Sequence, residues 1–410
     1  MALLEEERPT LPPRHFGAKG KHGFELIPTL RGLCVEALSK HFRERPTFKG
    51  IPEPFQQQMM EILPSDLPLN ITGALINKES YWRRCALERW QINELTEHGS
   101  SWKQLYFEKN LKEYLEEFDP AVTSAADFEE LLDTSKAFVY QLVLDQLPSH
   151  MELEMLFARL PKLISLQLTY SLRNVGMDYD RSQFGMRITD AASLAKEVKA
   201  TTSLTSLSLP RNLLDDDKVR ILATGLKDNG TITALDLSHN KIADRGTRAL
   251  AKILSPATCV LSHLNLADNQ VHAEGGKFLG RAMQVNVSLR SLDLRLNRLG
   301  ERGGCLLFEG MKKNSSLRTL NLSSNSLEIE SARSFASLVK QNKTLTELDL
   351  SCNFFVEDGC KVLLEGLRES GVLVKLDLRE NKVDEEDKRA IKEILRENLK
   401  KAKHDEYALL

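Results

Sequence analysis

One sequence phrase recurs along the second half of the chain and restricts what the chain can fold into. Its clearest copy occupies residues 289–299 and reads L-x-x-L-x-L-x-x-N-x-L. Successive copies lie 28 or 29 residues apart, and a weaker copy that begins at Leu163 has Ser171 in place of the asparagine. A constant period of this length predicts an array of stacked repeats rather than one globular core. The asparagines of the phrase are Asn212, Asn240, Asn269, Asn297, Asn325, Asn353 and Asn381.

Each copy of the phrase combines a short strand, a turn and a helix. Successive side chains of a strand point to opposite faces, so Leu292 and Leu294 face the core while Asp293 faces away. Asparagine suits the turn because its amide can hydrogen-bond backbone groups that have left the sheet. The residues after the asparagine have helical spacing, as at Leu250 and Leu254. These units predict an α/β fold, a ribonuclease-inhibitor-type leucine-rich repeat solenoid with a curved parallel sheet inside and helices outside.

Changes in composition divide the chain into four parts. Residues 1–22 are rich in proline, lysine and glutamate and predict a flexible tail. Residues 23–150 predict a mostly helical N-terminal domain that also caps the solenoid, because the strand-like residues 138–144 can start the sheet. Residues 151–383 predict the solenoid, with about eight strands. Residues 384–410 predict a charged C-terminal capping helix followed by a tail.

The N-terminal domain opens with an amphipathic pattern. Leucine and other apolar side chains recur at spacings of three and four, which predicts an amphipathic helix. The pattern comprises Leu26, Ile27, Leu30, Leu33, Cys34, Ala37 and Leu38.

One connection inside the solenoid is longer than the repeat requires. The strands that begin at Leu163 and Leu204 are 41 residues apart, and the surplus falls near residues 173–187. This insertion contains apolar residues, so it either folds back on the solenoid or packs against a partner, and the sequence favours neither. The apolar residues are Met177, Tyr179, Phe184 and Met186.

The strands place two columns of side chains on the concave face of the predicted solenoid. Aspartate and asparagine dominate the first column, which would suit a basic partner helix. The alternative is that the aspartate simply belongs to a common form of the repeat, L-D-L-S-x-N. The candidate partner surface comprises Asp236, Asn265, Asp293, Asn321, Asp349 and Asp377 of the first column, with Arg295 and Arg379 of the second.

A block of aromatic and arginine residues lies between residues 81 and 107 and contains all three tryptophans of the chain. Such residues can form the core of a small helical domain. They are also the usual anchors of a protein interface, so a docking groove is the alternative. The residues concerned are Tyr81, Trp82, Arg83, Arg84, Trp90 and Trp102.

Several classes of function find no support in the sequence. The formal net charge is −2, which does not favour nucleic acid or an anionic membrane as a partner. No nucleophile elbow, HExxH, Walker or kinase motif is present, so we expect no enzymatic activity, cofactor or metal. The six cysteines form no C-x-x-C pair, and no signal peptide or apolar run of about 18 residues is present. We therefore expect free thiols in a reducing, intracellular compartment.

The tryptophan block and its flanks resemble one family. The residues that carry the resemblance are 65–69 (SDLPL), 79–85 (ESYWRRC) and 99–103 (GSSWK), with 244–246 (DRG) and 264–271 (LNLADNQV) in the array. Over about residues 24–383 the chain resembles the t-complex-associated testis-expressed protein family, which is subunit five of the nexin-dynein regulatory complex. The tryptophan block is the specific part, because the repeats alone would match many proteins.

That resemblance implies a non-enzymatic scaffold in the axoneme of cilia and flagella, within the cytoplasm and cytoskeleton. The subunit would help to link doublet microtubules and to regulate dynein-driven motility. The implied partners are other subunits of the complex, including another leucine-rich repeat subunit, and indirectly the dynein arms and doublet microtubules.

Two other functions remain as alternatives. The array alone resembles ribonuclease inhibitor and the GTPase-activating protein for Ran, which would imply GTPase activation. Residues 63–103 loosely resemble an F-box, which would imply the substrate receptor of a ubiquitin ligase. The spacing of the tryptophan block departs from that of an F-box.

Overall fold

The computed structural model describes residues 29–119, 123–147, 151, 153–172, 184–255 and 259–408, with side chains up to residue 402. The predicted tail at 1–22, most of the insertion at 173–187 and the last two residues lie outside these ranges. The chain divides into two compact units, Met1–Tyr106 and Phe107–Leu410, here called the helical unit and the solenoid unit. The division falls inside helix α5 (Trp102–Glu116), so the later part of the expected N-terminal domain lies in the solenoid unit.

Short helices separated by prolines build the helical unit. Pro52 and Pro68 stand immediately before α2 and α3, where a fixed backbone angle and a missing amide hydrogen cost nothing. The core is formed by large side chains that are almost fully buried, among them Phe42, Met59 and Trp82. The helices are α1 (Leu30–Lys40), α2 (Glu53–Ile62), α3 (Leu69–Leu75), α4 (Glu79–Arg89) and the first part of α5, with a 3-10 turn η1 at Leu95–His98.

Helix α1 is present as predicted, but the apolar stripe that predicted it does not face the core. Val35 and Ser39 are the buried residues of α1. Leu30, Leu33 and Leu38 are 79%, 46% and 47% exposed. The packed face of this helix is therefore narrow, and most of its apolar stripe meets solvent.

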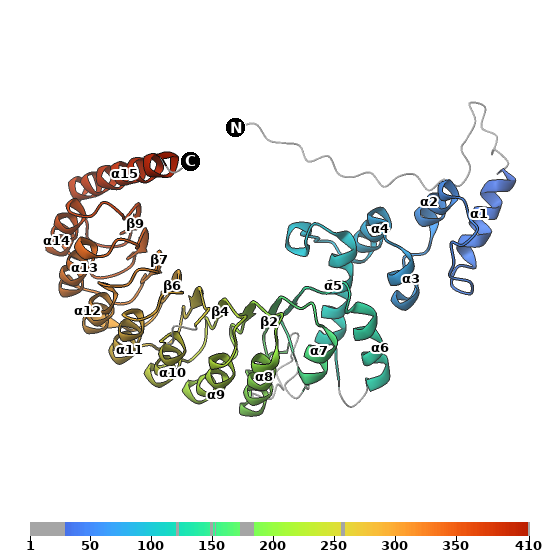
Figure 1. Ribbon diagram of the computed structural model, residues 1–410, viewed down its shortest axis with the longest axis horizontal. Helices are drawn as coiled ribbons and strands as arrows, with labels where there is room; N and C mark the ends of the chain where they lie inside the picture. Colours follow the sequence, from blue (N-terminus) through green and yellow to red (C-terminus); the bar gives the residue numbers. More distant parts are fainter. Residues whose placement is uncertain are drawn as a thin grey trace. The chain divides into compact units, whose positions relative to one another are not determined.

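The solenoid unit contains one parallel sheet of nine strands in the described residues, in the order of the chain. The strands follow the inner side of an arc and the helices cover its outer side, as the sequence predicted (Figure 1). The strands are β1 (Gln141–Leu144), β2 (Ser165–Leu168), β3 (Ser206–Ser208), β4 (Ala234–Asp236), β5 (His263–Asn265), β6 (Ser291–Asp293), β7 (Thr319–Asn321), β8 (Glu347–Asp349) and β9 (Lys375–Asp377). The helices are α6 (Ala125–Ser135), α7 (Leu153–Arg159), α8 (Ile188–Ala200), α9 (Asp216–Lys227), α10 (Asp244–Leu254), α11 (Ala273–Met283), α12 (Gly300–Met311), α13 (Ile329–Gln341), α14 (Glu357–Arg368) and α15 (Glu385–Ala408).

The asparagine of each repeat joins its own turn to the neighbouring repeat. The Asn297 amide nitrogen donates to the carbonyl oxygens of Leu266 and Leu294, at 2.8 and 3.0 Å. Its amide oxygen accepts from the Val271 backbone nitrogen at 3.0 Å. The other six asparagines make equivalent bonds, so a ladder of buried amides follows one rim of the sheet. The residue before every one of these asparagines has a left-handed backbone, with φ between 51° and 57°, as at Leu296.

A second asparagine ladder lies on the opposite rim of the sheet, in the connections from each helix to the next strand. It was not predicted from the sequence. The Asn314 amide nitrogen donates to the carbonyl oxygens of Met283 and Asn286, at 2.8 and 3.0 Å. Its amide oxygen accepts from the backbone nitrogens of Ser316 and Leu317, at 3.0 and 2.7 Å. The members of this ladder are Asn229, Asn286, Asn314 and Asn342, and Asn398 of α15 makes the corresponding donations to the last repeat.

Glycines allow neighbouring helices on the outer side to approach closely. A Cβ atom at Gly310 of α12 would lie 2.2 Å from the carbonyl oxygen of Gly280 in α11. The same distance separates a Cβ at Gly225 from the carbonyl oxygen of Ala195. Only glycine fits such contacts, so the spacing of these helices depends on it.

The strand expected at residues 138–144 does start the sheet, but only as β1 (Gln141–Leu144), and α5 lies against its edge. The Glu108 side chain accepts from the backbone nitrogens of Tyr140 and Gln141, at 2.8 and 2.9 Å. About two helical turns further along α5, the Glu116 side chain accepts from the Asp145 backbone nitrogen at 2.9 Å. Carboxylates of α5 thus satisfy amides on the sheet edge, which would otherwise offer a template for strand pairing.

The described end of the insertion folds back on the solenoid. Met186 is 2% exposed, and its backbone nitrogen donates to the carbonyl oxygen of Asn212 at 2.8 Å. Phe184 is partly buried, whereas Met177 and Tyr179 lie outside the described residues.

Candidate functional site

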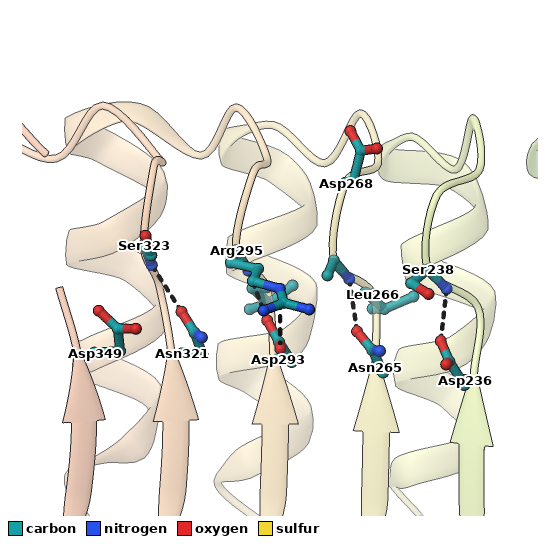
Figure 2. A network of polar contacts seen from close by, with 12 residues as sticks. Asp236, Ser238, Asn265, Leu266, Asp268, Asp293, Arg295, Asn321, Ser323 and Asp349 are labelled. Carbon is teal, nitrogen blue, oxygen red and sulfur yellow. Dashed lines mark hydrogen bonds and ion pairs between the residues drawn. The ribbon is translucent and has the colours of Figure 1, made fainter. Parts of the chain in front are cut away.

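The strand register brings the aspartate and asparagine column of the concave face into one continuous line. Asp236 pairs with Asn265, Asn265 with Asp293, and the pairing continues without a break to Asp377. Neighbouring strands are about 4.8 Å apart, so six side chains follow one another across the sheet. Figure 2 shows five of them at the ends of their strands, all on the same side.

Each member of this column uses one oxygen to close its own turn. Asp293 accepts from the Arg295 backbone nitrogen at 3.0 Å, and Asn265 accepts from the Ala267 nitrogen at 2.9 Å (Figure 2). The same bond, to the nitrogen two residues later, occurs at the other four members. The column therefore has a structural role in every repeat, which supports the interpretation that aspartate belongs to the repeat pattern.

The second carboxylate oxygen differs in its surroundings from one aspartate to the next. Arg379 donates to both oxygens of Asp377 and lowers the pKa of that carboxyl. Burial raises the pKa of Asp293, and Arg295 only partly opposes that rise, with 3.5 Å between Nε and the carboxylate. Asp236 and Asp349 have a serine two residues later and no lysine or arginine partner among the described side chains. The concave column is thus a mixed surface in which Asp236 and Asp349 form no ion pair within the described part of the chain, although the pKa of Arg379 is raised by its hydrogen bond to Asp377 and, to a smaller extent, by the Asp349 carboxylate.

In the tryptophan block, Tyr81 and Trp82 are core residues of the helical unit, 2% and 1% exposed. The Trp82 indole nitrogen donates to the carbonyl oxygen of Ile76 at 2.9 Å, and the Tyr81 hydroxyl donates to that of Pro64 at 3.1 Å. The two rings meet edge to face, with centroids 5.2 Å apart. These contacts assign Tyr81 and Trp82 to packing.

The other members of the block lie closer to the surface. Trp90 and Trp102 are half-buried, and each has an arginine over its ring, Arg89 at 4.9 Å and Arg83 at 5.9 Å. Arg84 donates to the carbonyl oxygen of Leu63, which ties α4 to the end of α2. The half-buried tryptophans and their arginines are the part of the block that a partner can reach.

A buried lysine under this block was missed by the sequence analysis. Lys103 is 5% exposed, and its amino group donates to the Gly73 carbonyl and the Asn77 side chain, both at 2.7 Å. Burial lowers its pKa, while the nearby Glu79 carboxylate opposes that effect. The amino group also lies 5.7 Å from the Trp82 ring centroid. The sequence around Lys103 gives no signal of burial, since its partners come from α3 (Gly73) and from the loop after it (Asn77).

The described residues bear on metal binding, membrane insertion and disulfide formation. Among them no group of three or more histidine, cysteine, aspartate or glutamate side chains is placed to hold a metal ion. No helix in the described part of the chain is long and apolar enough to cross a membrane. All six cysteines are free thiols.

Comparison with known proteins identifies the repeats and the relatives. A family model described as leucine rich repeat matches residues 228–251, 259–280, 285–306, 313–336 and 341–360. The mouse ribonuclease inhibitor is 31% identical over 130 residues, which are 25% of this chain and 28% of the inhibitor. Together with the observed sheet and helices, these matches confirm the predicted fold class.

The predicted resemblance is also confirmed. A protein of Chlamydomonas reinhardtii named dynein regulatory complex subunit 5 is 48% identical over 197 residues, or 48% of this chain and 50% of that protein. The mouse protein of the same name is 34% identical over 255 residues, covering 55% of this chain and 51% of the relative. The protein of that name from Macaca fascicularis is 35% identical over 295 residues, covering 65% of this chain and 58% of the relative. The matched region therefore spans between half and three-fifths of the relatives' length.

Proposed function

We propose that this chain is a non-enzymatic scaffold subunit of the nexin-dynein regulatory complex. In this role it helps to link doublet microtubules and to regulate dynein-driven ciliary and flagellar motility. The observation that supports the proposal best is the 48% identity over 197 residues to a protein named dynein regulatory complex subunit 5. The site of action that follows is the axoneme, and the partners that follow are other subunits of the same complex.

The geometry of the solenoid unit is compatible with a scaffold. Repeat units that contact only their neighbours give a long, rigid surface rather than a closed pocket. The concave column from Asp236 to Asp377 offers carboxylate and amide oxygens in a straight series. We propose this column, with Arg295 and Arg379, as a contact surface for another subunit.

Localisation in a ciliated cell tests the proposal directly. The tagged full chain should be found in the axoneme and should recover other regulatory-complex subunits from axonemal extracts. Cytosolic protein that is absent from the axoneme would contradict the proposal. The two alternatives have their own readouts: recovery of Skp1 for the ubiquitin-ligase receptor, and faster GTP hydrolysis by a small GTPase for the GTPase activator. The relatives found by comparison favour neither alternative.

The role of the concave face has a separate test. Asp349→Arg reverses a carboxylate that forms no ion pair with a described side chain, whereas Asp377→Asn removes one that is paired directly with Arg379. If a subunit binds this face, Asp349→Arg should weaken its recovery at least about tenfold, while Asp377→Asn should have a smaller effect. Equal recovery by both variants and the unmodified chain would remove the concave face from the proposal.

A further inference from the structure

Helix α1 carries an apolar face that no described residue of the helical unit covers. The helix has 11 residues, and at 1.5 Å per residue it is about 16 Å long. Leu30, Leu33 and Leu38 are 79%, 46% and 47% exposed, and Cys34 and Ala37 are exposed beside them. The opposite side packs on the helical unit through Val35 and Ser39.

These five exposed residues form one stripe. At about 100° per residue, positions 30, 33, 34, 37 and 38 fall within an arc of about 140° on the helix surface. The spacing of three and four residues is the pattern by which one helix packs along another. A monomeric protein seldom leaves so many leucines of a single helix in water, and such patches mark interaction sites.

The charges beside the stripe define what can pack there. Arg31 borders the stripe on one side and Lys40 borders it on the other, each about 20° beyond the last apolar residue. Both are exposed and form no ion pair with the described side chains, although the half-buried Glu36 lies one helical turn before Lys40 on the same flank. A leucine stripe between two cations fits an amphipathic partner helix whose own apolar stripe is flanked by glutamate or aspartate.

A second copy of the same helix fits poorly. In an antiparallel pair of α1 helices related by a twofold axis, the Arg31 flank of one copy would face the Arg31 flank of the other, and the two Lys40 flanks would face each other in the same way. Like charges beside a helix seam are unfavourable, whereas opposite charges set the choice of partner.

We propose that α1 is a docking site for an acidic amphipathic helix of another protein, which packs its apolar stripe on Leu30, Leu33 and Leu38. The site lies outside the leucine-rich repeats, and the inference does not depend on the proposed function.

A pair of synthetic peptides tests the inference on the full chain. Both have about three heptads with a leucine stripe, and they differ only in the residues that flank it, glutamate in one and lysine in the other. Fluorescence anisotropy at low ionic strength should show at least about tenfold tighter binding of the glutamate peptide, and this preference should shrink at about 0.5 M salt. Equal affinities for the two peptides, or no binding of either, would overturn the inference.

Variants of the chain locate the site. Leu33→Asp should weaken binding of the glutamate peptide at least about tenfold. Leu87→Asp is the matched control, because Leu87 of α4 is 48% exposed against 46% for Leu33. The double variant Arg31→Glu, Lys40→Glu should prefer the lysine peptide instead. Circular dichroism should show unchanged folding in all three, since the replaced side chains are exposed.

Three results would assign the stripe to something else. If Leu87→Asp weakens binding as much as Leu33→Asp, the peptide does not bind α1. A concentration-dependent dimer that Leu33→Asp abolishes would make a second copy the occupant. Peptide binding that requires deletion of residues 1–28 would make that segment the occupant, and each of these results contradicts the proposal.

Discussion

Removal of one rung of the first asparagine ladder should destabilise the solenoid far more than removal of one member of the concave column. Asn297 is 6% exposed, and its side chain holds the carbonyl oxygen of Leu266 at 2.8 Å and the nitrogen of Val271 at 3.0 Å. Asn297→Ala leaves both groups of the neighbouring repeat without this partner. A buried polar group left unpaired costs about 1–3 kcal/mol, so we expect a loss of about 3 kcal/mol or more.

The matched control is Asn321→Ala in the concave column. The Asn321 side chain is half-buried and accepts one bond, from the Ser323 nitrogen at 3.0 Å. Because water can reach that nitrogen after substitution, we expect a loss of about 0.5–1.5 kcal/mol. Urea unfolding followed by circular dichroism compares the two variants, and hydrogen exchange of the Val271 amide reports the local effect.

A second substitution at the same position adds a dependence on pH. Asn297→Asp keeps an oxygen for the Val271 nitrogen but places the other oxygen against the carbonyls of Leu266 and Leu294. Only the protonated carboxyl can donate there, so folding raises its pKa above about 3.9. The variant should therefore be nearest to the unmodified chain below about pH 4 and lose stability as pH rises through the folded-state pKa. Stability of Asn297→Ala within about 0.5 kcal/mol of the unmodified chain, or unchanged Val271 exchange, would refute the reasoning.

Three further substitutions test other parts of the fold. Trp82→Ala should cost the helical unit about 3–5 kcal/mol, seen as rapid proteolysis of that unit with the solenoid intact, and wild-type melting would contradict its role in the core. Gly310→Ala should cost about 1–3 kcal/mol in thermal unfolding because its Cβ would lie 2.2 Å from the Gly280 oxygen, whereas Gly230→Ala, with open space, should be neutral. Asp293→Asn should be at least as stable as the unmodified chain at pH 7. Burial raises the pKa of the Asp293 carboxyl, so folding favours its protonated form and the free energy of unfolding falls as pH rises above about 4. Lower stability of Asp293→Asn at pH 7 in urea unfolding would show that the charge is favourable.

The regular part of the fold was predictable because period and alternation act locally. Leu292 and Leu294 alternate with polar residues, and the period repeats that pattern in every neighbour, so strand position and register follow together. The second ladder escaped prediction although Asn286, Asn314 and Asn342 also lie 28 residues apart. Asparagine is common in any turn, and only the contacts between repeats distinguish a ladder from a series of unrelated turns.

The candidate surfaces were less predictable, because exposure depends on tertiary packing. The spacing of the leucines in α1 predicted an apolar face against the core, yet Val35 is buried in the helical unit and Leu33 is exposed. The aspartates of the concave column were compatible with an acidic surface and with the repeat pattern alone, and the structure shows that one oxygen of each closes a turn, as at Asp293. Spacing defines a face of a helix or strand but not what lies against that face.

The two asparagine ladders also determine how the solenoid unit responds to force. They follow opposite rims of the sheet, and bonds such as those from Asn297 to Leu266 and from Asn314 to Met283 cross a boundary between repeats. A pull along the array would load these bonds, on both rims at the boundaries where each ladder has a member, and successive boundaries would bear the tension in series. The array would therefore lengthen little before one boundary opens abruptly. Such a body behaves as a stiff strut that transmits displacement, rather than as a spring that absorbs it.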